Sequence, residues 1–102
     1  MKIYEIVVSE LAKEDLRNIY NYVRDVSFDY NARLVVERIA EKIASFDIFP
    51  ERTESIGKDK RGHDIRATSN GKYRIIYVVD RENGKVTVAR IFSVGQDFSR
   101  LI

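Results

Sequence analysis

The chain has 102 residues, no cysteine, and 18 lysine and arginine residues against 16 aspartate and glutamate residues. This length predicts one domain, residues 1–102, with a single two-layer core. The hydrophobic content of 44% excludes a disordered chain. The lack of cysteine excludes disulfide scaffolds and thiol catalysis. No run approaches the ~18 apolar residues of a membrane span, so we expect a soluble, cytoplasmic protein that does not contact a membrane.

The net charge of +2 hides an asymmetry along the chain. Residues 1–51 hold 7 basic and 10 acidic residues, a net charge of −3. Residues 52–102 hold 11 basic and 6 acidic residues, a net charge of +5. The second half is therefore where we expect an anionic partner to bind.

The first half predicts one strand and two helices. Residues 2–8 are mostly β-branched or aromatic, which is typical of a strand. Ser9 suits the N-cap of a helix running to about Asp25, and Asp29 is a candidate N-cap for a second helix that Pro50 closes. Apolar residues recur every three or four positions in both segments, as in amphipathic helices. With about four residues between them, the helices are expected to form an antiparallel hairpin.

The second half predicts a loop and three strands. Residues 51–62 are highly charged and have no hydrophobic period, which indicates a surface loop. Strands are predicted at residues 63–68, 73–79 and 86–93. The Asn70-Gly71 and Asn83-Gly84 pairs between them are strong signals for hairpin turns. The predicted fold is α+β in the order β-α-α-β-β-β, with the helix hairpin packed on one face of an antiparallel sheet.

A two-residue turn at Asn83-Gly84 would pair Tyr77 with Arg90 and assign the side chains of the last two strands to two faces. One face is rich in aromatic residues and is expected to pack against the helices. Its members are Tyr73, Ile75, Tyr77, Val79, Val88 and Phe92. Arg90 also falls on this face, where a position at the sheet rim would accommodate its charge. The other face is too apolar to be left in water, which predicts a groove covered by a partner. Its aliphatic residues are Ile76, Val78, Ala89 and Ile91.

Few side chains could carry catalysis. His63, next to Asp64, is the one histidine, and it is either a general base or a surface residue at a strand end. One histidine and scattered carboxylates do not make a metal-ligand set, and no glycine-rich phosphate loop occurs. We therefore expect neither a metal nor a cofactor.

The basic residues of the second half either converge on a phosphate-binding surface or solubilise a loop and a sheet edge. The eight of these eleven residues that could converge are Lys58, Lys60, Arg61, Arg66, Lys72, Arg74, Arg90 and Arg100. Whether Arg66 and Arg74 share a face depends on the turn between their strands. A two-residue loop would pair Arg66 with Ile75, whereas a three-residue loop can pair Arg66 with Arg74. The sequence leaves both registers open.

The sequence resembles the ParE/RelE superfamily of toxins from bacterial type II toxin–antitoxin systems over essentially its whole length. The motifs that carry the resemblance are Ser9-x-x-Ala12, Asp15-Leu16-x-x-Ile19, Phe49-Pro50, the segment from Gly71 to Tyr77 and the tail from Asp97 to Ile102. The resemblance implies a small α/β toxin that a ParD-like or RelB-like antitoxin neutralises, so that toxin and antitoxin form a hetero-oligomer. The antitoxin would wrap the toxin with a helix or an added strand, and the Ile76, Val78, Ala89 and Ile91 face would receive it.

The RelE-like branch of this superfamily cleaves mRNA on the ribosome, and the ParE-like branch poisons DNA gyrase. Arg74 matches the arginine that stabilises the scissile phosphate in RelE-like enzymes, and Arg66 matches a lysine of that set in charge. Asp64 and Asp97 stand where that branch has basic residues, and nothing in the sequence matches its terminal Tyr or His. The tail is more similar to the ParE-like pattern, which lacks this nuclease set.

The leading hypothesis is therefore a ParE-like toxin that binds DNA gyrase without cleaving nucleic acid. Its target-binding surface would comprise the basic residues Lys60, Arg61, Arg66, Arg74 and Arg100. The alternative is a ribosome-dependent mRNA endonuclease that uses Arg66, Arg74 and His63. A third possibility is a toxin-derived module that has lost toxicity and retains only partner binding.

Overall fold

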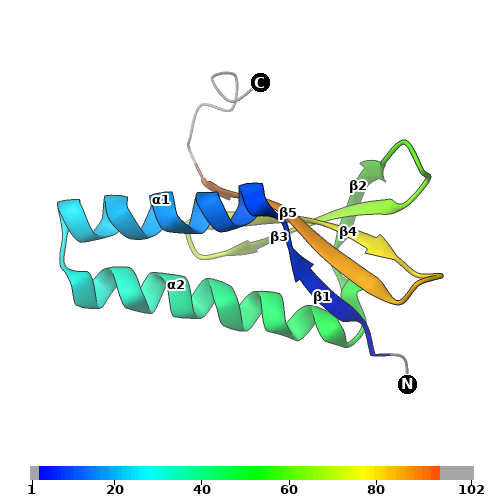
Figure 1. Cartoon of the computed structure of the whole chain (residues 1–102), viewed down its shortest axis with the longest axis horizontal. Helices are drawn as coiled ribbons and strands as arrows, with labels where there is room; N and C mark the ends of the chain where they lie inside the picture. Colours follow the sequence, from blue (N-terminus) through cyan, green and yellow to red (C-terminus); the bar gives the residue numbers. More distant parts are fainter. Residues whose placement is uncertain (1–2, 95–102) are drawn as a thin grey trace.

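The computed structural model describes residues 3–94, in which two helices pack against a five-stranded sheet (Figure 1). Along the chain the elements are β1 (Glu5–Val8), α1 (Glu10–Val26), α2 (Asp29–Ala44), β2 (Glu54–Lys58), β3 (Asp64–Asn70), β4 (Tyr73–Asp80) and β5 (Lys85–Ser93). Short 3-10 turns at Ser45–Asp47 and Pro50–Arg52 connect α2 to β2. The α+β class and the helix hairpin are as predicted.

The sheet is mixed rather than wholly antiparallel, which corrects the prediction. Its strand order is β1-β5-β4-β3-β2. The pairs among β2, β3, β4 and β5 are antiparallel, but β1 lies parallel to β5, with Glu5 opposite Lys85. A parallel pair needs a long connection, and here the helix hairpin and three strands supply it. Sequence order alone could not indicate that the first strand pairs with the last.

The helix predictions hold at α1 and need one correction at α2. Ser9 caps α1, because its Oγ accepts a hydrogen bond from the Ala12 N–H at 3.0 Å. The N-cap of α2 is Phe28, which caps without a side-chain hydrogen bond. Asp29 is instead the first residue of the helix, where it pairs with Arg33 at 2.8 Å and accepts a hydrogen bond from the Tyr20 hydroxyl.

The segment predicted as one loop contains the edge strand β2. All five residues of β2 are exposed, so the strand shows none of the alternation that burial of one face imposes. Its pairing with β3 also shifts register between Ser55 and Gly57. An exposed, irregular edge strand has no hydrophobic signature, which is why the sequence pattern indicated a loop.

Both hairpins in the second half have registers that differ from those predicted. Asn70 pairs with Tyr73, so Gly71 and Lys72 form the first turn, and Gly71 has a φ of +63° that favours glycine. Asp80 pairs with Lys85, so the second connection has four residues rather than two. The Asp80 carboxylate supports this longer loop by accepting hydrogen bonds from the backbone and side chain of Asn83.

A β-bulge at Ala89 changes the faces of β5. Tyr77 pairs with Val88 and Ile76 pairs with Arg90, which leaves Ala89 as the extra residue. The predicted pairing of Tyr77 with Arg90 is therefore wrong. Because of the shift, Ile91 rather than Phe92 points towards the helices, and Ile91 is only 2% exposed.

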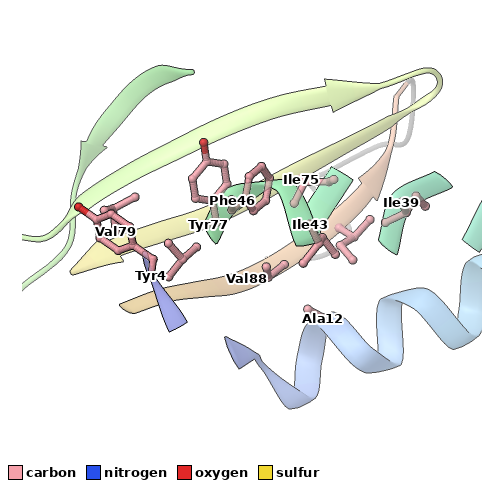
Figure 2. Packing of buried hydrophobic residues seen from close by; sticks show 11 residues of the cluster. Tyr4, Ala12, Ile39, Ile43, Phe46, Ile75, Tyr77, Val79 and Val88 are labelled. Carbon is pink, nitrogen blue, oxygen red and sulfur yellow. The ribbon is translucent and has the colours of Figure 1, made fainter. Parts of the chain in front are cut away.

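The core lies between the helices and the predicted aromatic face of β4, which confirms that part of the prediction. The helical side supplies Ala12, Ile39, Ile43 and Phe46, and the sheet supplies Ile75, Tyr77, Val79, Val86, Val88 and Ile91. Figure 2 shows the rings of Phe46 and Tyr77 side by side, stacked with their centroids 4.1 Å apart. The buried Tyr77 hydroxyl donates to the Pro50 carbonyl at 2.7 Å, so its polar atom is satisfied inside the core.

In residues 3–94, neither helix has the length and apolar character needed to cross a bilayer.

Candidate partner-binding surfaces

An open groove of about 1250 Å³ runs along α1. On this side of the molecule the helix hairpin extends past the sheet (Figure 1). The groove is bounded by α1, by the β3–β4 turn and by the end of β5, with α2 residues Val35 and Ile39 also lining it. Leu11, Tyr22 and Val26 on α1 line the groove, yet each keeps more than half of its surface exposed. Large apolar side chains that stay exposed on a concave surface are typical of a protein-binding site.

One wall of this groove is fixed by a contact between α1 and β5. The Asp15 carboxylate accepts hydrogen bonds from Arg90 Nε at 2.9 Å and Nη2 at 3.1 Å, and from the Ile91 N–H at 2.9 Å. The hydrogen bonds that Arg90 donates to Asp15 raise the pKa of Arg90. The guanidinium also lies 4.9 Å from the centre of the Phe92 ring. Arg90 is thus at the sheet rim, in the position that accommodates its charge.

Hydrogen bonds from α1 and its N-cap Ser9 take the place of strand pairing along part of one edge of β5. β1 pairs with β5 only over Lys85–Val88, so the rest of that edge of β5 has no strand beside it. The Asp15 carboxylate accepts a hydrogen bond from the Ile91 N–H, and the Ser9 hydroxyl donates one to the Ala89 carbonyl at 2.9 Å. Because α1 satisfies these edge groups, the edge is a poor template for an added strand.

The face of the sheet away from the helices carries three of the four residues predicted to receive the antitoxin. Directly paired residues share a face, and Val78 pairs with Ile65 and Thr87 there. Ile76 and Ala89 are half-buried like Val78. Ile91 belongs to the opposite face, because the bulge turns it into the core. The residues Ile65, Ile76, Val78 and Ala89 are called the open face below.

The structure does not bring the predicted target-binding residues together. Lys60 and Arg61 lie in the β2–β3 loop, beside the β4 end at Val79, whereas Arg74 pairs with Ser69 at the other end of the strand. Arg66 pairs with the buried Tyr77, so Arg66 and Arg74 point to opposite faces; neither predicted turn register is correct. Arg100 lies outside the described residues.

Arg66 has a structural role. Its guanidinium donates to the carbonyls of Glu51 and Thr53 and pairs with Asp64 at 2.7 Å. Hydrogen bonds from Ser55 and then Arg66 lower the pKa of Asp64. Arg66 therefore ties the segment that enters β2 to the sheet, and few of its donors remain for an external phosphate.

His63 lies between two carboxylates, away from Arg74. Its Nδ1 is 3.5 Å from Asp59 and its Nε2 is 3.7 Å from Asp80. The His63 N–H lowers the pKa of Asp59, and the Asn83 side chain lowers that of Asp80, so both carboxylates are charged at neutral pH. Two negative charges beside the imidazole oppose the approach of a phosphate. Among residues 3–94, no three His, Cys, Asp or Glu side chains form a group that could hold a metal.

The sequence model of "ParE toxin of type II toxin-antitoxin system, parDE" matches residues 6–98. The chain belongs to the ParE toxin family. This match spans the helix hairpin, the sheet and the groove, as the resemblance of the motifs implied. No match to a curated protein sequence was found.

Three solved structures share this ParE/RelE-like fold at low sequence identity. The chromosomal ParDE system of P. aeruginosa is 16% identical with a TM-score of 0.73, covering 90% of this chain and 97% of that one. The toxin–antitoxin complex RelBE2 of Mycobacterium tuberculosis is 19% identical with a TM-score of 0.62, covering 94% and 97%. The archaeal RelE–RelB complex of Pyrococcus horikoshii OT3 is 14% identical with a TM-score of 0.67, covering 93% and 99%.

Sequence reasoning missed the groove. The apolar stripe of α1 continues to Val23 and Val26, which was the available signal, but a stripe does not reveal where the sheet beneath it ends. The two residues lie where the sheet no longer covers the helix, and they line the groove instead of the core.

Proposed function

We propose that this chain is a cytoplasmic toxin that a cognate antitoxin holds inactive and that, once released, binds DNA gyrase. The observation that carries the proposal is the ParE family match over residues 6–98. The three similar structures come from toxin–antitoxin systems, which supports a hetero-oligomer with an antitoxin.

The groove is the proposed binding site of the antitoxin. Its volume of about 1250 Å³ exceeds the roughly 300–1,000 Å³ typical of small-molecule pockets. The lining residues of α1 run from Leu11 to Val26, about 22 Å of helix. A peptide segment with an apolar stripe would cover Leu11, Tyr22 and Val26. The open face, with Ile76, Val78 and Ala89, is a second proposed contact for a segment that continues around the sheet.

A binding activity accounts for the polar residues better than catalysis does. In-line RNA cleavage needs a base, an acid and a cation at one phosphate. Arg66 and Arg74 lie on opposite faces, and His63 is held between Asp59 and Asp80. Of the basic candidates, Lys60, Arg61 and Arg74 remain as proposed target contacts, together with Arg100, which lies outside the described residues.

A supercoiling assay tests the gyrase proposal. Purified toxin is incubated with gyrase, ATP and relaxed plasmid, and we expect lost supercoiling or a trapped cleavage complex. Toxin premixed with antitoxin is the matched control and should have no effect. If toxin shown by circular dichroism to be folded changes neither readout, the gyrase proposal is wrong.

The alternative mRNA endonuclease rests on Arg74, which matches the RelE-like phosphate-binding arginine and is half-buried on the uncovered side of the sheet. Primer extension on translated mRNA after induction tests it. Under the gyrase proposal no codon-phased cuts appear. Codon-phased cuts that disappear in Arg74→Ala would establish the alternative instead.

A further inference from the structure

The charged residues that line the groove are distributed unevenly between its walls. Glu14 projects from α1, whereas Arg38 of α2 and Lys72 of the β3–β4 turn belong to the facing side. The Asn70 side chain donates to the Arg38 carbonyl at 2.8 Å, and the Val94 N–H donates to the Lys72 carbonyl at 2.5 Å. These bonds tie the turn to α2 and to β5, so the two cations are carried on a fixed wall.

Neighbouring charges are already paired within the protein. Asp15 and Arg90 form a two-bond ion pair inside the groove. On the outer surfaces of the helices, Lys13 pairs with Glu10 at 3.2 Å and Arg33 pairs with Asp29 at 2.8 Å. Within residues 3–94, Glu14, Arg38 and Lys72 have no such ion pair although all three are exposed.

An apolar segment that covers this groove must therefore come close to three charges that form no ion pair within residues 3–94, of which Glu14 is only partly offset by the charge of Arg90. Covering a charge without a counter-charge is costly, and like charges placed together exclude wrong partners. A segment with matching charges at its margins avoids both penalties. Opposite signs on opposite walls also fix which side of the segment faces α1.

We propose that Glu14 on one wall, and Lys72 with Arg38 on the other, select the antitoxin by charge. The segment that fits has an apolar stripe, a basic residue facing Glu14 and an acidic residue facing Lys72 and Arg38. This inference rests on the proposed function, because it takes the occupant of the groove to be the antitoxin. It adds the residues of this chain that distinguish a cognate antitoxin from others.

Binding measured by calorimetry on charge-reversed variants tests the proposal. The probe is the purified product of the open reading frame adjacent to this gene, once it has been shown to neutralise the toxin in cells. Glu14→Lys and Lys72→Glu should each raise the Kd for the antitoxin roughly 5–30-fold at low salt. The increase should be smaller at high salt, because salt screens the charges. The matched controls are Glu37→Lys and Lys85→Glu, which reverse exposed charges outside the groove. Each control should change Kd by less than about two-fold.

The outcomes separate this proposal from the proposed function. If the wild-type chain binds the antitoxin but both groove variants match their controls in Kd, charge selection is wrong while the antitoxin partnership stands. If the folded wild-type chain does not bind the antitoxin, the proposed function itself fails. Escape of Glu14→Lys from neutralisation in cells, suppressed by a basic-to-acidic change in the antitoxin, would support charge selection directly.

Discussion

At the scale of single residues, Asp15 shows how a polar side chain can be structural. It joins α1 to β5 through hydrogen bonds to the Arg90 guanidinium and the Ile91 N–H. The Asp15 side chain is 13% exposed and that of Arg90 is 29% exposed, so solvent screens the pair only partly. The motif Asp15-Leu16-x-x-Ile19, which contributed to the family resemblance, therefore has a physical basis in the sheet edge.

Replacement of Asp15 tests this role. Asp15→Ala should lower the free energy of unfolding by about 2–4 kcal/mol, because it leaves a partly buried cation and an edge N–H without partners. Urea unfolding monitored by circular dichroism measures the change. Glu37→Ala, at an exposed position that forms no ion pair within residues 3–94, should stay within about 0.5 kcal/mol of wild type. An equal effect of the two substitutions would contradict the role assigned to Asp15.

Asp64 makes stability depend on pH. Its pKa is lowered in the folded state by hydrogen bonds from Ser55 and Arg66. A lowered folded pKa means that the stabilisation is present above the unfolded pKa of about 3.9 and is lost as the pH falls through the folded value. We expect Asp64→Asn to destabilise the chain at pH 7 and to cost much less near pH 2.5. Urea titrations of both proteins at the two pH values measure this, and a cost independent of pH would contradict it.

At the scale of elements, the junction between β1 and α1 depends on Ser9. Its hydroxyl accepts from the Ala12 N–H and donates to the Ala89 carbonyl, so one side chain caps the helix and covers the sheet edge. Ser9→Ala should cost about 1–2 kcal/mol, and Ser9→Thr, which retains the hydroxyl, should cost less. Thermal unfolding ranks the three proteins. If Thr and Ala are equally destabilising, the hydroxyl is not the cause.

The elements that the sequence predicted are those in which burial imposes a period. The stripes of α1 and α2 and the alternation of β4 are of this kind, and their buried faces are as expected. β2 was missed because it is wholly exposed. The register of β5 was missed because it depends on the Asp80–Asn83 contacts and on the bulge at Ala89. Neither feature changes the spacing of hydrophobic residues in the sequence. The β3–β4 register decides whether Arg66 and Arg74 share a face of the sheet. Because the sequence did not determine that register, it could not predict that the two arginines are separated.

At the scale of the whole molecule, the helix hairpin is longer than the sheet that it covers, and the excess length creates the groove. Phe28 and Tyr30 at the hairpin turn are as exposed as Tyr22, but they do not line the groove. Of these three exposed aromatic side chains of similar accessibility, only Tyr22 belongs to the proposed antitoxin-binding groove.

This arrangement provides a matched test of the groove. Tyr22→Ser should weaken antitoxin binding by roughly ten-fold or more, because a large aromatic anchor at the centre of an interface is lost. Tyr30→Ser removes a tyrosine of similar exposure outside the groove and should leave Kd nearly unchanged. Because both side chains are largely exposed, neither substitution should move the unfolding midpoint by much. Equal effects on Kd would place the antitoxin elsewhere.

The pairing of β1 with β5 also governs the order in which the chain can fold. Glu5 lies beside Lys85, so the sheet cannot close until almost all of the described chain has left the ribosome. Until then the helix hairpin has only part of its core to pack against, and contacts between such distant segments form slowly. During that interval the groove does not yet exist as a formed surface. A nascent chain that lacks β5 therefore also lacks the proposed antitoxin-binding groove, so we expect antitoxin to bind only after β5 has joined the sheet.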